Sequence, residues 1–189
     1  MALLAVDDES RDDEWATELR TAVTSNIKEL GRKRRAREAV EALTMLGRNG
    51  VKPDTVAATA LLDACCKSGE VELAKSVFDR LFAGGADGLI VPDEMTFTVL
   101  LRALTNSEPP QWAAASALLI KAEREYGQPP STALFNILVY TCARVNDTER
   151  GLALLEKMQD MGVPADDGTL AAVSKRKALR AVVKRMLRE

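Results

Sequence analysis

The sequence predicts an all-α fold, a right-handed α-solenoid in which antiparallel helix hairpins stack on one another. The chain of 189 residues is 47% hydrophobic but only 4% aromatic, a balance that favours packed helices over a sheet sandwich. A Pro-Asp word also recurs, as RNGVKPD (48–54), GLIVPD (88–93) and, reordered, DMGVPADD (160–167). The second interval is about twice the first, and repetition on this scale indicates stacked supersecondary units.

An apolar segment with helical spacing follows each of the first two words, and a third such segment follows GQPPS (127–131). TVAATALLDACCK (55–67), EMTFTVLLRALT (94–105) and TALFNILVYTCAR (132–144) carry apolar residues at offsets of one and four, which lie on one face of a helix. The three sets are Leu61, Leu62 and Cys65; Leu100, Leu101 and Leu104; and Leu138, Val139 and Cys142. Since Pro disfavours helix for the residue before it and Asp can cap the next helix, the word separates hairpins.

A short polar break and a second amphipathic segment complete each unit. The breaks are SGE (68–70), NSEPP (106–110) and VND (145–147). In the first unit, residues at intervals of three and four form the stripe of a helix packed on a neighbour: Val71, Ala74, Phe78 and Leu81. One hairpin cannot bury its apolar faces alone, so we expect successive hairpins to stack.

The organisation expected from these signals has six parts. They are an acidic, flexible N-terminus (1–14), a degenerate N-terminal hairpin (15–54), repeats 1 to 3 (55–93, 94–131 and 132–166) and a basic C-terminal capping segment of one or two helices (167–189).

Composition excludes several chemistries. The chain has no histidine, so it lacks His-dependent catalytic pairs and Cys/His zinc sites. Cys65, Cys66 and Cys142 form no C-x-x-C motif, and we expect small buried residues in a reducing compartment. No Gly-rich phosphate loop is visible, and no apolar run approaches the roughly 20 residues that span a bilayer. We therefore expect no catalytic residue, no metal and no cofactor.

Charge is unevenly distributed although the net charge is only −2. DDESRDDE (7–14) is acidic, whereas RKRRAR (32–37) and residues 175–188 are basic. Such segments can bind phosphates or an acidic partner, or they can be solvated helix surfaces. The candidate contacts are Arg32, Lys33, Arg34, Arg35, Lys175, Arg176 and Lys177.

Two stretches resemble the pentatricopeptide repeat: DTVAATALLDACCKSGEVELAKSVFDRL (54–81), flanked by GVKPD and VPD, and LFNILVYTCARVNDTERGLALLEKMQDMGV (134–163). Residues 94–131 match less well, and residues 15–54 match mainly in the second helix. The resemblance implies that the chain binds single-stranded RNA in a chloroplast or mitochondrion, one base per repeat.

The resemblance also implies which side chains read the bases: the fifth residue of each first helix and the last residue of each repeat. Thr59 with Asp93 implies a preference for guanine, and Asn136 with Asp166 a preference for uracil. Thr98 with Ser131 matches no trusted pair. In the N-terminal hairpin, Thr21 and Thr24 compete for the first position and neither is assigned.

Alternatives remain open at this stage. The Thr and Asn residues can be polar surface residues, and Asp54, Asp93 and Asp166 can be helix caps and nothing more. The chain can also be a non-catalytic scaffold that binds protein subunits of a large organellar assembly, such as a ribosome or a photosynthetic or respiratory complex. The family's nuclease and deaminase domains have no counterpart after residue 167, so we expect no enzyme.

Localisation is implied by the resemblance alone. The N-terminal residues MALLAVDDESRDDEW are acidic, whereas transit peptides are rich in Arg and Ser and poor in acids. Either a targeting segment has been removed from this sequence, or the protein is not imported by that route.

Overall fold

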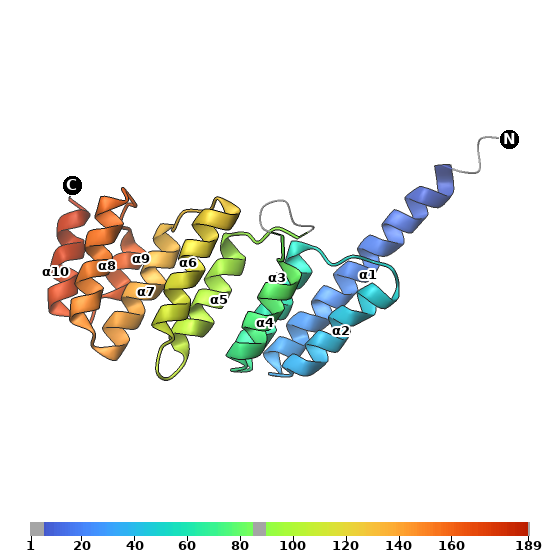
Figure 1. Cartoon of the computed structure of the whole chain (residues 1–189), viewed down its shortest axis with the longest axis horizontal. Helices are drawn as coiled ribbons and strands as arrows, with labels where there is room; N and C mark the ends of the chain where they lie inside the picture. The colour runs from blue at the N-terminus through green and yellow to red at the C-terminus, as the bar shows by residue number, and fades with distance from the viewer. Residues whose placement is uncertain (1–5, 85–89, 189) are drawn as a thin grey trace. The chain divides into compact units, whose positions relative to one another are not determined.

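The computed structural model describes residues 6–84 and 90–188, and regular structure in these ranges is helical (Figure 1). The helices are α1 (Val6–Arg32), α2 (Ala36–Arg48), α3 (Thr55–Lys67), α4 (Val71–Leu81), α5 (Glu94–Asn106), α6 (Trp112–Tyr126), α7 (Thr132–Val145), α8 (Thr148–Asp160), α9 (Asp167–Ala172) and α10 (Lys177–Met186). None of the described helices is both long enough and apolar enough to span a membrane.

The chain forms two compact units, Met1–Leu100 (unit 1) and Leu101–Glu189 (unit 2). In unit 1, α1 packs against α2 and α3, and α3 packs against α4. In unit 2, α7 packs against α8 and α9, and α10 packs against α8 and α9. Each unit is therefore built from antiparallel hairpins whose first helices lie side by side.

The Asp of each Pro-Asp word starts a helix. Asp54 Oδ1 accepts a hydrogen bond from the Ala57 amide (2.8 Å), and Asp93 Oδ1 accepts one from the Thr96 amide (2.8 Å). Asp166 caps α9 through the Thr169 amide (2.7 Å). Each bond satisfies an N–H that has no partner within the first helical turn, and the capping role is thus confirmed.

The apolar sets expected on the first helices are buried. All nine of their members are at most 4% exposed: Leu61, Leu62, Cys65, Leu100, Leu101, Leu104, Leu138, Val139 and Cys142. In unit 1, the ring of Phe78 lies 5.2 Å from that of Phe82 and 5.8 Å from that of Phe97. In unit 2, a second cluster joins α7, α8 and α10 with the residue that follows α9: Val139, Leu155, Val173, Leu179 and Val183.

Two segments differ from the sequence expectation or refine it. Residues 6–14, expected to be a flexible segment, are the first turns of α1, and no Pro or Gly interrupts them in the sequence. Residues 1–5 and 85–89 lie outside the described residues. The C-terminal segment forms two helices, α9 and α10.

Candidate nucleic-acid interface

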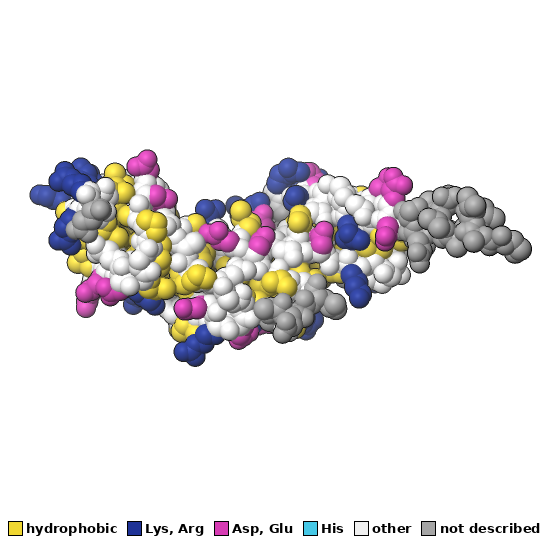
Figure 2. All heavy atoms as spheres, turned by 90° about the horizontal axis from the view of Figure 1, so that it is seen from above, with side chains coloured by type: hydrophobic (Ala, Val, Ile, Leu, Met, Phe, Trp, Pro, Cys, Tyr) yellow, Lys and Arg dark blue, Asp and Glu magenta, His cyan; other side chains and the backbone are white. Residues whose placement is uncertain are grey.

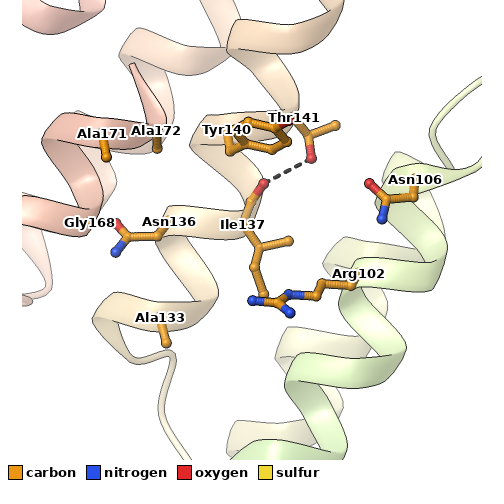
Figure 3. A pocket seen from close by; sticks show the side chains of 10 residues that line it. All are labelled: Arg102, Asn106, Ala133, Asn136, Ile137, Tyr140, Thr141, Gly168, Ala171 and Ala172. Carbon is orange, nitrogen blue, oxygen red and sulfur yellow. Dashed lines mark hydrogen bonds between the residues drawn. The ribbon is translucent and has the colours of Figure 1, made fainter. Parts of the chain in front are cut away.

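The structure brings Asn136 and Asp166 together in the third repeat. Asn136 lies on α7, and Asp166 precedes α9. The Asn136 amide Nδ2 donates a hydrogen bond to Asp166 Oδ1 (3.0 Å), which also accepts one from the hydroxyl of Thr169 (2.9 Å). Asp166 is therefore both a helix cap and the group that orients the Asn136 side chain, which projects toward α9 in Figure 3.

Hydrogen bonding lowers the pKa of the Asp166 carboxyl, chiefly through the Asn136 amide and next through the Thr169 backbone. Donors aimed at a carboxylate favour its charged form. The stabilisation of the fold is therefore complete above the ordinary Asp pKa of about 3.9 and is lost as the pH falls through the lowered value.

We expect Asn136→Ala to move the pKa of Asp166 upward, toward its ordinary range, because the largest cause of the shift is removed. A carboxyl-detected NMR titration of both proteins measures this. Asn49→Ala, which removes an exposed amide bonded to the Met45 carbonyl on α2, is the control and leaves the value unchanged. An Asp166 pKa that is identical in wild type and Asn136→Ala contradicts the assignment.

Gly168 is a residue that the sequence analysis missed. A Cβ at this position would lie 3.0 Å from Asp166 Oδ1 and 2.9 Å from Asn136 Nδ2, and the second distance is shorter than a Cβ keeps from other heavy atoms. The absence of a side chain thus permits the Asn136–Asp166 contact. A glycine placed within the first turn of a helix was the available signal, because glycine is unfavourable there without such a reason.

Thr59 and Asp93 are linked in the first full repeat through a third residue, Thr96. Thr96 Oγ1 donates to Asp93 Oδ1 (2.7 Å) and lies 2.7 Å from Thr59 Oγ1. Because the single hydroxyl proton of Thr96 is used on Asp93, Thr59 is the donor to Thr96. The Asp-x-x-Thr spacing, present at both Asp93 and Asp166, was the sequence signal for this link.

The other sequence-predicted reading positions are placed as follows. Thr98 is half-buried on α5 in unit 1, and Ser131 caps α7 in unit 2 by accepting from the Leu134 amide. In the N-terminal hairpin, Thr21 is exposed and Thr24 is buried. Both line a hollow of about 220 Å³ beside Asp54, so the choice between them stays open.

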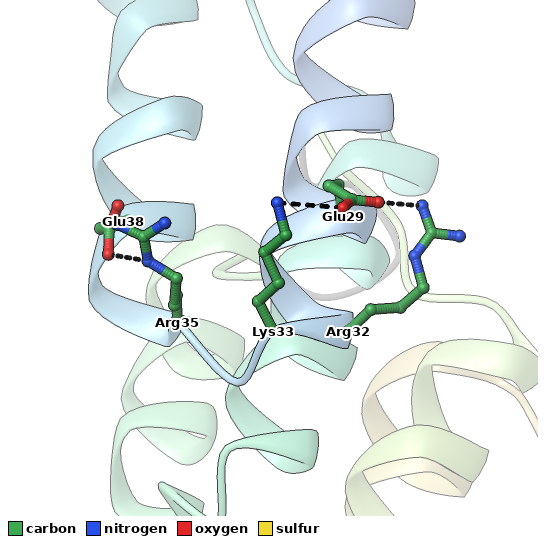
Figure 4. A network of polar contacts seen from close by, with 5 residues as sticks. All are labelled: Glu29, Arg32, Lys33, Arg35 and Glu38. Atoms are coloured by element: carbon green, nitrogen blue, oxygen red, sulfur yellow. Dashed lines mark hydrogen bonds and ion pairs between the residues drawn. The ribbon is translucent and has the colours of Figure 1, made fainter.

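Three cations of the basic RKRRAR segment pair with acids of unit 1 (Figure 4). Arg32 and Lys33 both bind the Glu29 carboxylate, at 2.6 and 3.1 Å, and Arg35 binds Glu38. The Lys33 and Arg32 partners lower the pKa of Glu29. Of the four predicted contacts, Arg34 alone has no ion pair among the described residues, and the other three share the two carboxylates of Glu29 and Glu38.

The C-terminal segment leaves more cations unpaired. Arg176 Nε donates to the Ala143 carbonyl (2.6 Å) and so fixes the segment to α7. Lys175 and Lys177 are exposed and have no ion pair among the described residues. Further exposed cations follow: Arg180, Lys184, Arg185 and Arg188. Figure 2 shows Lys and Arg side chains gathered at the end of unit 2 that carries α10.

The cysteines have the properties of structural thiols. Cys65 and Cys142 are buried, Cys66 is half-buried, and all three are free. Burial raises the pKa of Cys65 and Cys142 to about 11 and that of Cys66 to about 12. The thiols are therefore protonated at neutral pH and poorly nucleophilic. The described residues contain no group of His, Cys, Asp and Glu that could hold a metal ion.

Comparisons with known protein families match two parts of the chain. The family model described as "PPR repeat family" matches residues 53–106, and the one described as "PPR repeat" matches residues 133–163. No curated protein sequence matches the chain significantly.

Solved structures share the fold. They include the pentatricopeptide repeat protein PPR10 from maize (23% identity, TM-score 0.66, 88% of this chain and 24% of that chain) and PPR10 in complex with an 18-nt psaJ RNA element (17%, 0.68, 87% and 25%). Another is the PPR domain of Arabidopsis thaliana protein-only RNase P 1 in complex with tRNA (18%, 0.64, 90% and 89%). The chain thus spans about a quarter of the PPR10 chains.

Stacked antiparallel helix hairpins define a helical-repeat protein, and the predicted all-α solenoid class is confirmed. The chain carries a short array of pentatricopeptide repeats, which the two family models match over residues 53–106 and 133–163.

Proposed function

We propose that this protein is a non-catalytic module that binds single-stranded RNA through the first helices of its repeats. The observation that carries the proposal is the Asn136–Asp166 pair, in which a cap residue orients an amide at the predicted reading position. A side chain held in place before binding loses less conformational entropy when it contacts a base. PPR10 and the PPR domain of protein-only RNase P 1, which share the fold, are solved with RNA.

The donors and acceptors that remain free on Asn136 and on Thr59 suit different bases. Asn136 uses one amide hydrogen on Asp166 and keeps the second, which a carbonyl oxygen of uracil can accept. Thr59 uses its proton on Thr96 and keeps its lone pairs, which suit the N–H groups on the pairing edge of guanine. The preferences implied by the family resemblance thus agree with the donors and acceptors left free.

Exposed apolar side chains lie close to the Thr59 position in unit 1. Val56 is 58% exposed on α3, one turn before Thr59, and Met95 is 60% exposed next to Thr96 on α5. Their side chains offer apolar contacts to the faces of a base. The unpaired cations of α10 add phosphate contacts, which make the affinity depend on salt.

The double variant Thr59→Ala/Asn136→Ala tests the proposal. Losing two hydrogen bonds of about 1 kcal/mol each is expected to weaken binding of a 20-nucleotide RNA of randomised sequence by about 10- to 30-fold, measured by fluorescence anisotropy at low salt. The matched control Thr44→Ala/Asn49→Ala removes the same groups from α2 and keeps wild-type affinity. Equal affinities of the two double variants would overturn the role of the reading positions.

We propose a chloroplast or mitochondrion as the compartment, on the strength of the family alone. Fractionation of cells that express the full-length protein tests it, and recovery outside both organelles would refute it.

A second candidate function, a scaffold for protein neighbours in a large assembly, rests on a different surface. An apolar hollow of about 520 Å³ lies between α6 and α8, with Trp112, Leu154 and Met161 in its lining, and Ile120 within it is 50% exposed. Exposed apolar patches of this kind often mark protein contacts. Size-exclusion chromatography of native extracts separates the two functions: release by ribonuclease supports RNA, and persistence in a large particle supports the scaffold.

A further inference from the structure

A hollow of about 600 Å³ in unit 2 has Asn136 in its lining (Figure 3). Its walls come from α7 and from the helices on either side, α5 and α9. Arg102 and Asn106 project from α5, Tyr140 from α7, and Ala171 and Ala172 from α9. The volume falls within the roughly 300–1,000 Å³ of small-ligand pockets.

Tyr140 supplies an aromatic surface to this hollow. It lies one turn after Asn136 on α7 and is 52% exposed, so the core does not use its ring. Its hydroxyl has no hydrogen-bond partner among the described residues. The α9 side of the hollow carries small residues, Ala171 and Ala172, which leave space beside the ring. A planar group of a ligand can therefore stack there.

Arg102 supplies a positive charge to this hollow. It is exposed and has no ion-pair partner among the described residues, and no Asp or Glu lines the hollow. The corresponding residue of α3 in unit 1, Asp63, is instead paired with Lys67 at 2.5 Å. An unpaired guanidinium favours a phosphate, which it can bind through two parallel hydrogen bonds.

We propose that this hollow binds one nucleotide of a single-stranded RNA, with its base stacked on Tyr140 and a phosphate bound by Arg102. The proposal rests on the proposed function and adds to it a contact outside the repeated reading positions. Every base has an aromatic face, so stacking on Tyr140 adds affinity without selecting a base. Selection at this repeat is left to Asn136.

The test compares Tyr140→Ala, Tyr140→Phe and Arg102→Gln with wild type, using oligouridylate and oligoadenylate 20-mers. Loss of a stacked base, about 1–3 kcal/mol, predicts that Tyr140→Ala binds both RNAs about 5- to 100-fold more weakly. Tyr140→Phe keeps the ring and stays within about twofold of wild type. Arg102→Gln lowers the slope of log affinity against log salt by about 0.7, the value for one phosphate of a single strand.

Cross-linking tests direct contact between Tyr140 and RNA, which a purely structural role of Tyr140 would not produce. Photoactivated 4-thiouridine RNA is expected to form an adduct at Tyr140, identified by mass spectrometry. Circular dichroism checks that the exposed substitutions leave the fold intact.

The outcomes separate this site from the proposed function. If wild type binds RNA and Thr59→Ala/Asn136→Ala weakens it, while Tyr140→Ala binds normally and the adduct lies elsewhere, the site is overturned and the proposed function stands. If wild type binds neither 20-mer nor the randomised RNA, both are overturned.

Discussion

Phe78→Ala is expected to lower the free energy of unfolding by about 3–5 kcal/mol, the typical cost of truncating a buried Phe. Phe78 is 2% exposed on α4, and its ring contacts those of Phe82 and Phe97. The substitution removes the middle ring of this cluster and leaves a cavity that its neighbours cannot fill. Urea unfolding followed by circular dichroism measures the change.

Met95→Ala is the matched control in the same unit, because Met95 is largely exposed. Its substitution is expected to change the free energy of unfolding by about 0.5 kcal/mol or less. If Phe78→Ala were no more destabilising than Met95→Ala, the aromatic cluster would not be a core of unit 1.

Gly31→Leu is expected to destabilise the protein by about 1–3 kcal/mol, the usual cost of overpacking. A Cβ at Gly31 would lie 3.0 Å from the Cβ and 3.1 Å from the Cα of Ala64. Because one of these atoms belongs to the α3 backbone, α1 would have to move away from α3 to admit a larger side chain. Chemical denaturation of the purified variant gives the value.

Gly47→Leu makes the same change on α2, where a Cβ would meet no atom within 4 Å. There the higher helix propensity of Leu is expected to stabilise the protein by about 0.5–1 kcal/mol. Opposite signs for the two substitutions support close α1–α3 packing, and equal signs would contradict it.

The pattern of apolar residues was sufficient for the helices and for their buried faces. Offsets of one and four set the inner face of α3, and that face is buried because a helix with one apolar stripe is stable only when the stripe packs. The capping residues could also be predicted from the sequence, since the side chain of an Asp just before a helix reaches only the amides of the turn that follows it. The sequence analysis did not anticipate that the acidic residues 6–14 are part of α1, because charge alone does not oppose a helix.

The candidate site could be predicted only in part from the sequence. Position within the repeat indicated Asn136 and Asp166, but the roles of Thr96 and Gly168 depend on contacts between consecutive hairpins. The ion pairs of the RKRRAR segment likewise depend on how Glu29 and Glu38 are placed on α1 and α2. A count of charges cannot show this pairing.

The sequence by itself determined the repeat, its helices and its capping residues, because these depend on spacing along the chain and on interactions within a turn or two. The tertiary structure decided which polar groups remain free to meet a ligand. Thr59 can only accept a further hydrogen bond because its hydroxyl already donates to Thr96. Asn136 can donate one because its amide is oriented by Asp166 and keeps one free hydrogen. Tyr140 and Arg102 face a common hollow because packing places α5 and α7 around it, and no local pattern specifies which side chains the neighbouring helices leave unpaired.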